Sequence, residues 1–151
     1  MLRQTLTDAL KEAMKAKDET ATSALRLILA ALKDRDIAAR TKGDGGELGD
    51  DEILGLLQSM IKQRRESIEM YEKGGRTELA EQEKREIEII EGFLPEQMSD
   101  DAMAAAIAAV IAETGADSIK DMGRVMGVLK AEHAGTMDFS KASKMVKEKL
   151  L

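Results

Sequence analysis

The sequence predicts an all-α protein, because its apolar residues recur at helical spacing and its composition is poor in strand-forming side chains. Aromatic residues make up 2% of the 151 residues, and there is only one proline. The 43% hydrophobic content includes ten Met alongside Leu, Ile and Ala. Unbranched and small side chains lose little rotamer freedom in a helix, whereas aromatic residues favour strands. A chain of this length can build one ordinary domain or two small ones.

An N-terminal unit of four helices is expected over residues 1–95. The first pattern begins at Leu2 and fades in the charged stretch 15–18, and the second runs from a cap at Asp18 or Thr20 to about residue 40. The third covers 52–73 after a cap at Asp50 or Asp51 and stops at Gly74 and Gly75, and the fourth starts at Thr77. In the second pattern Leu27 and Ala31 widen the apolar stripe, so that helix is expected to touch more than one neighbour.

The glycine-rich stretch 41–49 is expected to be an exposed, mobile loop, because it has no apolar periodicity. A phosphate cradle is the other interpretation of such glycines. The sequence after the stretch lacks the Lys-Ser/Thr of a P-loop and no strand is expected before it, so the loop is favoured.

Charged residues dominate the outer faces predicted for the third and fourth helices. Lys62, Arg64 and Arg65 are expected to point outward. On the fourth helix, Glu83, Glu86, Glu88 and Glu91 lie at spacings that would suit a metal site or acid–base catalysis. Helical carboxylate metal sites also need a matching His, so a solvated face pairing with Lys84 and Arg85 is favoured and no metal site is predicted.

Pro95 marks the expected hinge, since a proline disfavours helix at the residue before it. A three-helix tail domain is expected over residues 96–151. Ser99, Ser118 and Asp138 are the predicted caps of its helices, and Gly115 and Gly135 are the predicted breaks.

The tail contains the residues chosen as a candidate binding surface for RNA or a protein partner. These are Lys120, Arg124, Lys130, Lys141, Lys144 and Lys147. Gly123 and Gly127, four residues apart, would leave a flat strip where another helix can approach closely. The same lysines also fit an ordinary solvated helix face, which is the alternative.

Composition and charge restrict the functions that the chain can have. The net charge of −6 argues against bulk attraction to nucleic acid, so any such binding must be local. Residues 99–151 are nearly neutral, because they hold 7 Lys and Arg against 8 Asp and Glu. The absence of Cys excludes thiol catalysis and thiolate metal sites. No signal peptide or membrane span is recognised, and a soluble cytoplasmic protein is expected.

No self-sufficient active site is apparent, and no cofactor is expected. The single His, His133, would need an orienting carboxylate and a pocket to act as a general base, so a surface or capping role is favoured.

Several runs of the chain resemble the YqeY family. They are LRLILAALK (25–33), IKQRRES (61–67), GFLPEQMSDD (92–101), TGADSIKDMGRVMGVLK (114–130) and MVKEKLL at the end. The resemblance covers nearly the whole chain, and DMGRVM is its most specific part. It implies two helical parts, the second similar to the C-terminal tail domain of the B subunit of glutamine-dependent aspartyl/glutamyl-tRNA amidotransferase.

The resemblance implies an accessory protein that contacts tRNA, an aminoacyl-tRNA synthetase or an amidotransferase. No DNA or membrane partner is expected. Carbon–nitrogen ligase activity with glutamine as amide donor is attached only by family association, so enzymatic activity stays open. The turn 131–138 has no Lys or Arg, whereas the family usually places basic residues there. The alternative is a protein-interaction adaptor with no RNA role, and the oligomeric state is not predicted.

Overall fold

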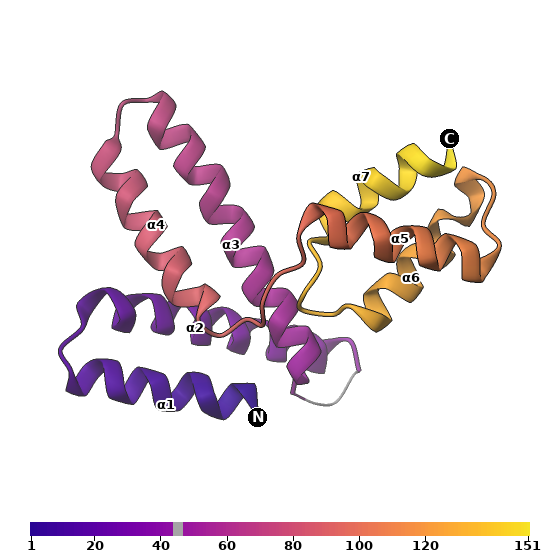
Figure 1. Ribbon diagram of the computed structural model, residues 1–151. Helices are drawn as coiled ribbons and strands as arrows, with labels where there is room; N and C mark the ends of the chain where they lie inside the picture. Colours follow the sequence, from indigo (N-terminus) through magenta and orange to yellow (C-terminus); the bar gives the residue numbers. More distant parts are fainter. Residues whose placement is uncertain (44–46) are drawn as a thin grey trace. The chain divides into compact units, whose positions relative to one another are not determined.

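The computed structural model describes residues 1–43 and 47–151 and has the predicted all-α fold (Figure 1). These residues form seven α-helices and one 3-10 helix and contain no strand. The elements are α1 (Leu2–Lys15), α2 (Glu19–Thr41), α3 (Asp50–Lys73), α4 (Thr77–Glu91), α5 (Asp100–Thr114), η1 (Ile119–Asp121), α6 (Met122–Glu132) and α7 (Phe139–Leu150). They divide into two compact units, Met1–Leu94 and Pro95–Leu151.

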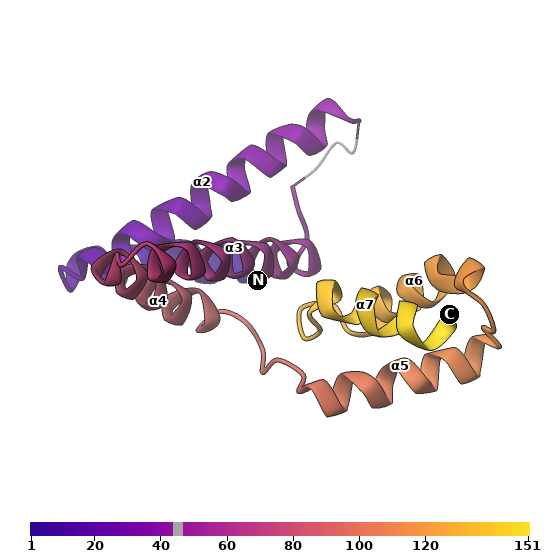
Figure 2. The ribbon, with the colours of Figure 1, turned by 90° about the horizontal axis from the view of Figure 1, so that it is seen from above.

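The N-terminal unit consists of two helical hairpins, α1–α2 and α3–α4 (Figures 1 and 2). Helix α2 packs on α1, α3 and α4, as its wide apolar stripe predicts. Ala31 belongs to this packing, but Leu27 is 47% exposed and does not. The core of the unit is formed by Leu6, Ala13, Leu25, Ile28, Leu32, Ile53, Leu56, Leu57, Met60, Ile61, Ile87 and Ile90.

The α1–α2 turn holds Lys17 in a left-handed conformation (φ 57°), which a non-glycine residue adopts only at a cost. Backbone bonds close the turn, because the N–H groups of Lys17 and Asp18 donate to the carbonyls of Met14 and Ala13. The Asp18 carboxylate then accepts the Ala21 N–H at 3.1 Å. Asp18 is therefore the N-cap of α2, and Thr20 lies inside the helix.

We expect Lys17→Gly to stabilise the N-terminal unit by about 0.5 kcal/mol. Relief of the left-handed strain is worth about 1 kcal/mol, and the greater freedom of glycine in the unfolded chain offsets part of it. Chemical denaturation measures the change. Lys11→Gly, inside α1, is the matched control and should destabilise by about 1 kcal/mol. Equal decreases in the free energy of unfolding of the two variants would contradict the strain at Lys17.

A buried carboxylate ties the segment after α2 to α1. Asp36 is the one charged side chain in the buried set of the described residues. Its carboxylate accepts hydrogen bonds from both terminal nitrogens of Arg3, at 2.8 and 3.0 Å, and from the Leu48 N–H at 3.0 Å. Arg3 also donates to the Leu48 carbonyl at 3.2 Å. The hydrogen bonds to Arg3 are the main reason that the pKa of Asp36 is lowered.

The stretch 41–49 is only partly a loop. Thr41 still belongs to α2, and Gly43 has a positive φ of 83° just after it. Residues 44–46, which are also expected to belong to this loop, lie outside the described residues. Residues 47–49 are irregular and lead into α3, whose N-cap is Gly49 rather than Asp50 or Asp51.

Two expectations for the faces of α3 and α4 are wrong. Arg64 was expected to point outward, but its side chain is only 11% exposed, and its Nε lies 2.9 Å from Glu86 and 3.8 Å from Glu83. Those two glutamates accordingly face α3, whereas Lys84 pairs with Glu72 and Glu81. The reason is that α4 packs along α3, so the face that looked solvated is half covered.

The tail unit packs α5, α6 and α7 against one another. Its core consists of Met103, Ile107, Val110, Val125, Leu129, Met137, Ala142, Val146 and Leu150. Within each helix these side chains recur at three- and four-residue spacing, which places one stripe of each helix inside.

Of the five predicted helix boundaries in the tail, four are confirmed and one is wrong. The side chains of Ser99 and Asp138 accept backbone N–H groups in the first turns of α5 and α7. Gly115 ends α5 in the left-handed conformation (φ 66°). Gly135 lies in the turn between α6 and α7 with a positive φ of 81°. Ser118, in contrast, makes no side-chain cap bond and precedes the short helix η1, so α6 begins only at Met122.

Candidate functional site

The outer face of η1 and α6 brings together three of the predicted cations and both glycines. Val125 and Leu129 are fully buried on the inner side of α6. At 100° per residue, Gly123, Arg124, Gly127 and Lys130 fall on the opposite side of α6. Lys120 lies just before them in η1, and all five residues are exposed. We call these five residues the α6 outer face.

The two glycines leave the backbone of α6 open to a partner. Outside the neighbouring backbone of its own helix, a Cβ atom built on Gly123 or Gly127 would meet no atom within 4 Å. Among the described residues, therefore, no helix occupies the strip that was predicted from their spacing. A partner could approach this helix more closely than helices with side chains on every face allow, and the predicted role of the strip as a contact stays a prediction.

Arg124 is held by a neighbouring acid, whereas the two lysines of this face extend into solvent. Asp121 lies 3.3 Å from Arg124 and accepts the backbone N–H of Asp117 at 3.1 Å. That backbone hydrogen bond is the main reason that the pKa of the Asp121 carboxyl is lowered. Since Asp121 stays ionised, it offsets part of the charge of Arg124, and Lys120 and Lys130 dominate the positive charge here.

The remaining three predicted cations form a separate row along α7. Lys141, Lys144 and Lys147 are exposed and lie opposite the buried Ala142 and Val146. Lys141 is 3.5 Å from Asp100, at the start of α5, so it is the member of the row with an acidic neighbour. The six predicted residues thus occupy the outer faces of η1, α6 and α7.

The turn 131–138 is ordered by backbone contacts rather than by charge. The His133 carbonyl accepts the N–H groups of Thr136 and Met137, and Met137 is fully buried. Gln97 donates to the Gly135 carbonyl at 2.7 Å, which ties the start of the tail unit to this turn. Glu132 is the acid nearest His133 among the described ion pairs, and at 3.9 Å it is too far to orient the imidazole by a hydrogen bond.

The acidic cluster on α4 is a polar contact that the sequence interpretation missed. Burial, followed by the charge of Glu86, raises the pKa of the Glu83 carboxyl. Arg64 faces both carboxylates, which leaves this cluster as an internal charge network of the α3–α4 hairpin. Within residues 1–43 and 47–151, no group of three or more His, Cys, Asp or Glu side chains could hold a metal ion.

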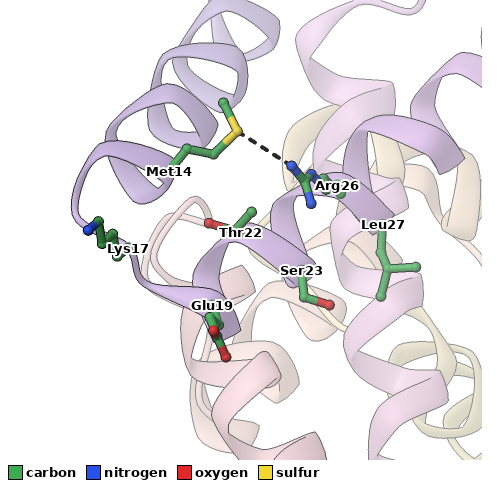
Figure 3. Close-up of a pocket in the computed structure, with 7 residues that line it drawn as sticks. All are labelled: Met14, Lys17, Glu19, Thr22, Ser23, Arg26 and Leu27. Carbon is green, nitrogen blue, oxygen red and sulfur yellow. Dashed lines mark hydrogen bonds between the residues drawn. The ribbon is translucent and has the colours of Figure 1, made fainter.

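An open hollow of about 600 Å³ at the α1–α2 corner was also missed (Figure 3). Its lining combines the apolar side chains of Met14 and Leu27 with the hydroxyls of Thr22 and Ser23. Arg26 reaches across it, with its Nη2 3.6 Å from the Met14 sulfur. The sequence contains one sign of the hollow, because Leu27 is apolar but lies beside the main apolar stripe of its helix.

Membrane-spanning potential is weak in the described helices. None of them alone combines the length and apolar character needed to cross a bilayer. The bent pair 100–114 and 119–132 meets both requirements jointly, on length and composition alone.

Comparison with known proteins identifies fungal relatives. The chain is 38% identical over 85 residues to "Altered inheritance of mitochondria protein 41, mitochondrial" of Lachancea thermotolerans, which covers 56% of this chain and 43% of that protein. It is 34% identical over 85 residues to the protein of the same name from Eremothecium gossypii (56% and 44%), and 36% identical over 92 residues to that from Candida glabrata (61% and 49%). The chain thus spans about half the length of the curated relatives it matches.

These names contradict the expectation of a cytoplasmic location, because all three relatives are named as mitochondrial proteins. The model of the family described as Yqey-like protein matches residues 3–150, nearly the whole chain. The resemblance inferred from the DMGRVM stretch is confirmed by this match. The chain belongs to the YqeY family.

Proposed function

We propose that this chain is an accessory binding protein whose tail unit holds tRNA by its phosphate backbone. The observation that carries the proposal is the set of six exposed cations on the outer faces of η1, α6 and α7. Phosphate neutralisation by Lys and Arg supplies most of the sequence-independent affinity for nucleic acid. The only aromatic side chain of the tail is Phe139, half-buried against the core, so contact with the backbone is favoured over stacking on bases.

The open strip of glycines supports contact by a rigid, bulky partner. Because even a Cβ atom at Gly123 or Gly127 would have no neighbour within 4 Å outside the backbone of its own helix, a ribose-phosphate backbone can lie close to α6 between Lys120 and Lys130. Shape and phosphate contacts of this kind are how folded RNA is commonly recognised.

We expect the intact chain to bind tRNA at low salt and lose affinity steeply as salt rises. Lys120→Glu/Lys130→Glu should weaken binding at least about tenfold and reduce the slope of log K against log[salt] by roughly 2, since two phosphate contacts are lost. Fluorescence anisotropy with labelled tRNA measures both quantities. Lys11→Glu/Lys42→Glu, exposed in the N-terminal unit, is the control with the same change in net charge. Equal effects of the two double variants would contradict a site on the α6 outer face.

A protein-interaction adaptor is the second candidate, and the same glycine strip favours it, because small residues let helices pack closely. Gly127→Leu should then abolish capture of a protein partner that survives nuclease treatment, while leaving tRNA affinity unchanged. Loss of tRNA affinity in Gly127→Leu, with no nuclease-resistant partner, supports the first proposal instead.

A further inference from the structure

The outer surface of α2 in the N-terminal unit carries a stripe of exposed side chains, including the large aliphatic residues Leu27 and Ile37, that no other helix covers among the described residues. Leu27 is 47% exposed and Ile37 is 49% exposed, whereas Leu25, Ile28 and Leu32 of the same helix are almost completely buried. Exposed large aliphatic residues aligned on a helix are typical of a surface that another element covers. This stripe lies in the N-terminal unit, whereas the cations on which the tRNA proposal rests lie in the tail unit.

The spacing of the stripe is that of a helix-pairing seam. Its members recur at alternating intervals of four and three residues and are all exposed; they are Ser23, Leu27, Ala30, Asp34, Ile37 and Thr41. In heptad notation Leu27, Asp34 and Thr41 take the a positions, and Ser23, Ala30 and Ile37 take the d positions. We call these six residues the α2 seam. It extends about 27 Å, at 1.5 Å per residue.

Within the seam, the charges at the g positions have one sign, whereas the preceding g position is Glu19 in the lining of the hollow. The g positions are Arg26, Lys33 and Arg40, all exposed, whereas the e positions are all alanine. Charges at the e and g positions select the partner of a paired helix and its orientation. A helix that presents Glu or Asp along its flank complements this row, and a basic helix is repelled by it.

The hollow at the α1–α2 corner continues the seam at its N-terminal end. Ser23, Arg26 and Leu27 belong both to the seam region and to the lining, and Met14 of α1 closes the other side (Figure 3). Met is an adaptable side chain that suits a surface receiving another apolar group. A large aliphatic side chain of the partner fits this hollow as an anchor.

The same charges disfavour a second copy of this chain as the occupant. In an antiparallel pair the two g rows would face each other, bringing three cations against three. In a parallel pair Asp34 would meet Asp34 at the central a position, and the basic g row would face only alanines. Both arrangements lack the charge complementarity that a different, acidic helix supplies.

We propose that the α2 seam is a docking site for an acidic amphipathic helix of a partner protein. Leu27, Ala30 and Ile37 contact the apolar face of that helix, and Arg26, Lys33 and Arg40 pair with its acidic flank. The apolar contact is small, so the complex is transient and depends on charge.

The test uses the intact chain and two synthetic helical peptides of three heptads. Both have Leu at the a and d positions, with Asn at the central a position to meet Asp34. One has Glu at every e and g position, and the other has Lys there. Fluorescence anisotropy of the labelled peptides is expected to show saturable, salt-sensitive binding of the Glu peptide and none of the Lys peptide.

Charge reversal, and replacement of an apolar seam residue by Asp, make the test specific to the seam. Arg26→Glu/Lys33→Glu should weaken binding of the Glu peptide at least about tenfold and permit binding of the Lys peptide. The matched control is Lys11→Glu/Arg35→Glu, because both residues are exposed and lie off the seam. Ile37→Asp should abolish binding, whereas Met70→Asp, 74% exposed on α3, should not change it. Circular dichroism establishes that each variant is folded.

Three outcomes would overturn the proposal. The first is failure of the Glu peptide to bind at up to about 1 mM, or equal binding of both peptides. The second is an equal effect of the two double charge reversals. The third is self-association of the free chain in sedimentation experiments that Ile37→Asp disrupts, since this would identify a second copy as the occupant.

Discussion

Replacing Asp36 by Ala is expected to lower the free energy of unfolding of the N-terminal unit by about 2–3 kcal/mol. The substitution removes the acceptor of two Arg3 hydrogen bonds and of the Leu48 N–H. Removing one partner of a buried ion pair typically costs roughly 3–5 kcal/mol, because the other charge is left uncompensated. The Arg3 side chain retains 29% exposure and can be partly hydrated, which reduces the cost.

The contribution of Asp36 to the free energy of unfolding should decrease at low pH. Its pKa is lowered in the folded protein, mainly by the hydrogen bonds from Arg3. A carboxyl group with a lowered pKa stabilises the fold above its unfolded pKa of about 3.9, and this stabilisation is lost as the pH falls through the folded value. The difference between wild type and Asp36→Ala should therefore be constant near neutral pH and shrink below about pH 4.

Denaturant titrations of wild type and variant at several pH values measure both effects. Asp34→Ala is the matched control, because Asp34 lies two residues away on α2 and is exposed. It should change stability by less than about 0.5 kcal/mol at any pH. A loss in Asp36→Ala no larger than that in Asp34→Ala would contradict the contact with Arg3 and Leu48.

Leu129→Ala is expected to destabilise the tail unit by about 3 kcal/mol. Leu129 is fully buried in the core of that unit, and truncating a buried Leu costs about 2–5 kcal/mol through lost burial and the cavity left behind. A helical unit this small has a free energy of unfolding of only about 3–5 kcal/mol. The substitution should therefore unfold much of the tail at room temperature.

Hydrogen exchange resolved by peptide distinguishes the two units. In Leu129→Ala, amide protection should fall throughout residues 95–151 and persist over residues 1–43 and 47–94, because each unit has its own core. Leu129→Met, which nearly preserves side-chain volume, should retain protection in both units. An equal loss of protection in the N-terminal unit would show that the two units unfold together.

Local features of the helices were well predicted, because they depend on residues close in sequence. The caps at Asp18, Ser99 and Asp138 are made by side chains that bond to N–H groups two or three residues on. The left-handed end of α5 at Gly115 follows from the missing Cβ of glycine. Ser118 was misjudged because the backbone after it forms η1 first, which delays α6 by one turn.

The faces of the helices were predicted less well, since periodicity identifies a stripe but not the neighbour that covers it. Arg64 and Glu86 are 22 residues apart and meet because α4 packs along α3. Leu27 reads as part of a buried stripe, yet half of its surface stays exposed beside the α1–α2 hollow. On α4, the large apolar side chain of Leu79 is likewise 41% exposed.

The sequence alone determined the helical class, most helix ends, the family and the set of tail cations, because these depend on composition, local hydrogen bonding and motifs. Which charged groups are paired and which faces stay open depends on the packing of the helices in the folded chain. This packing brings Arg3 to Asp36 across 33 residues and leaves Gly123, Gly127 and the α2 seam uncovered among the described residues. Such contacts depend on which helices pack together, and helical periodicity carries no information about the partner that a face meets.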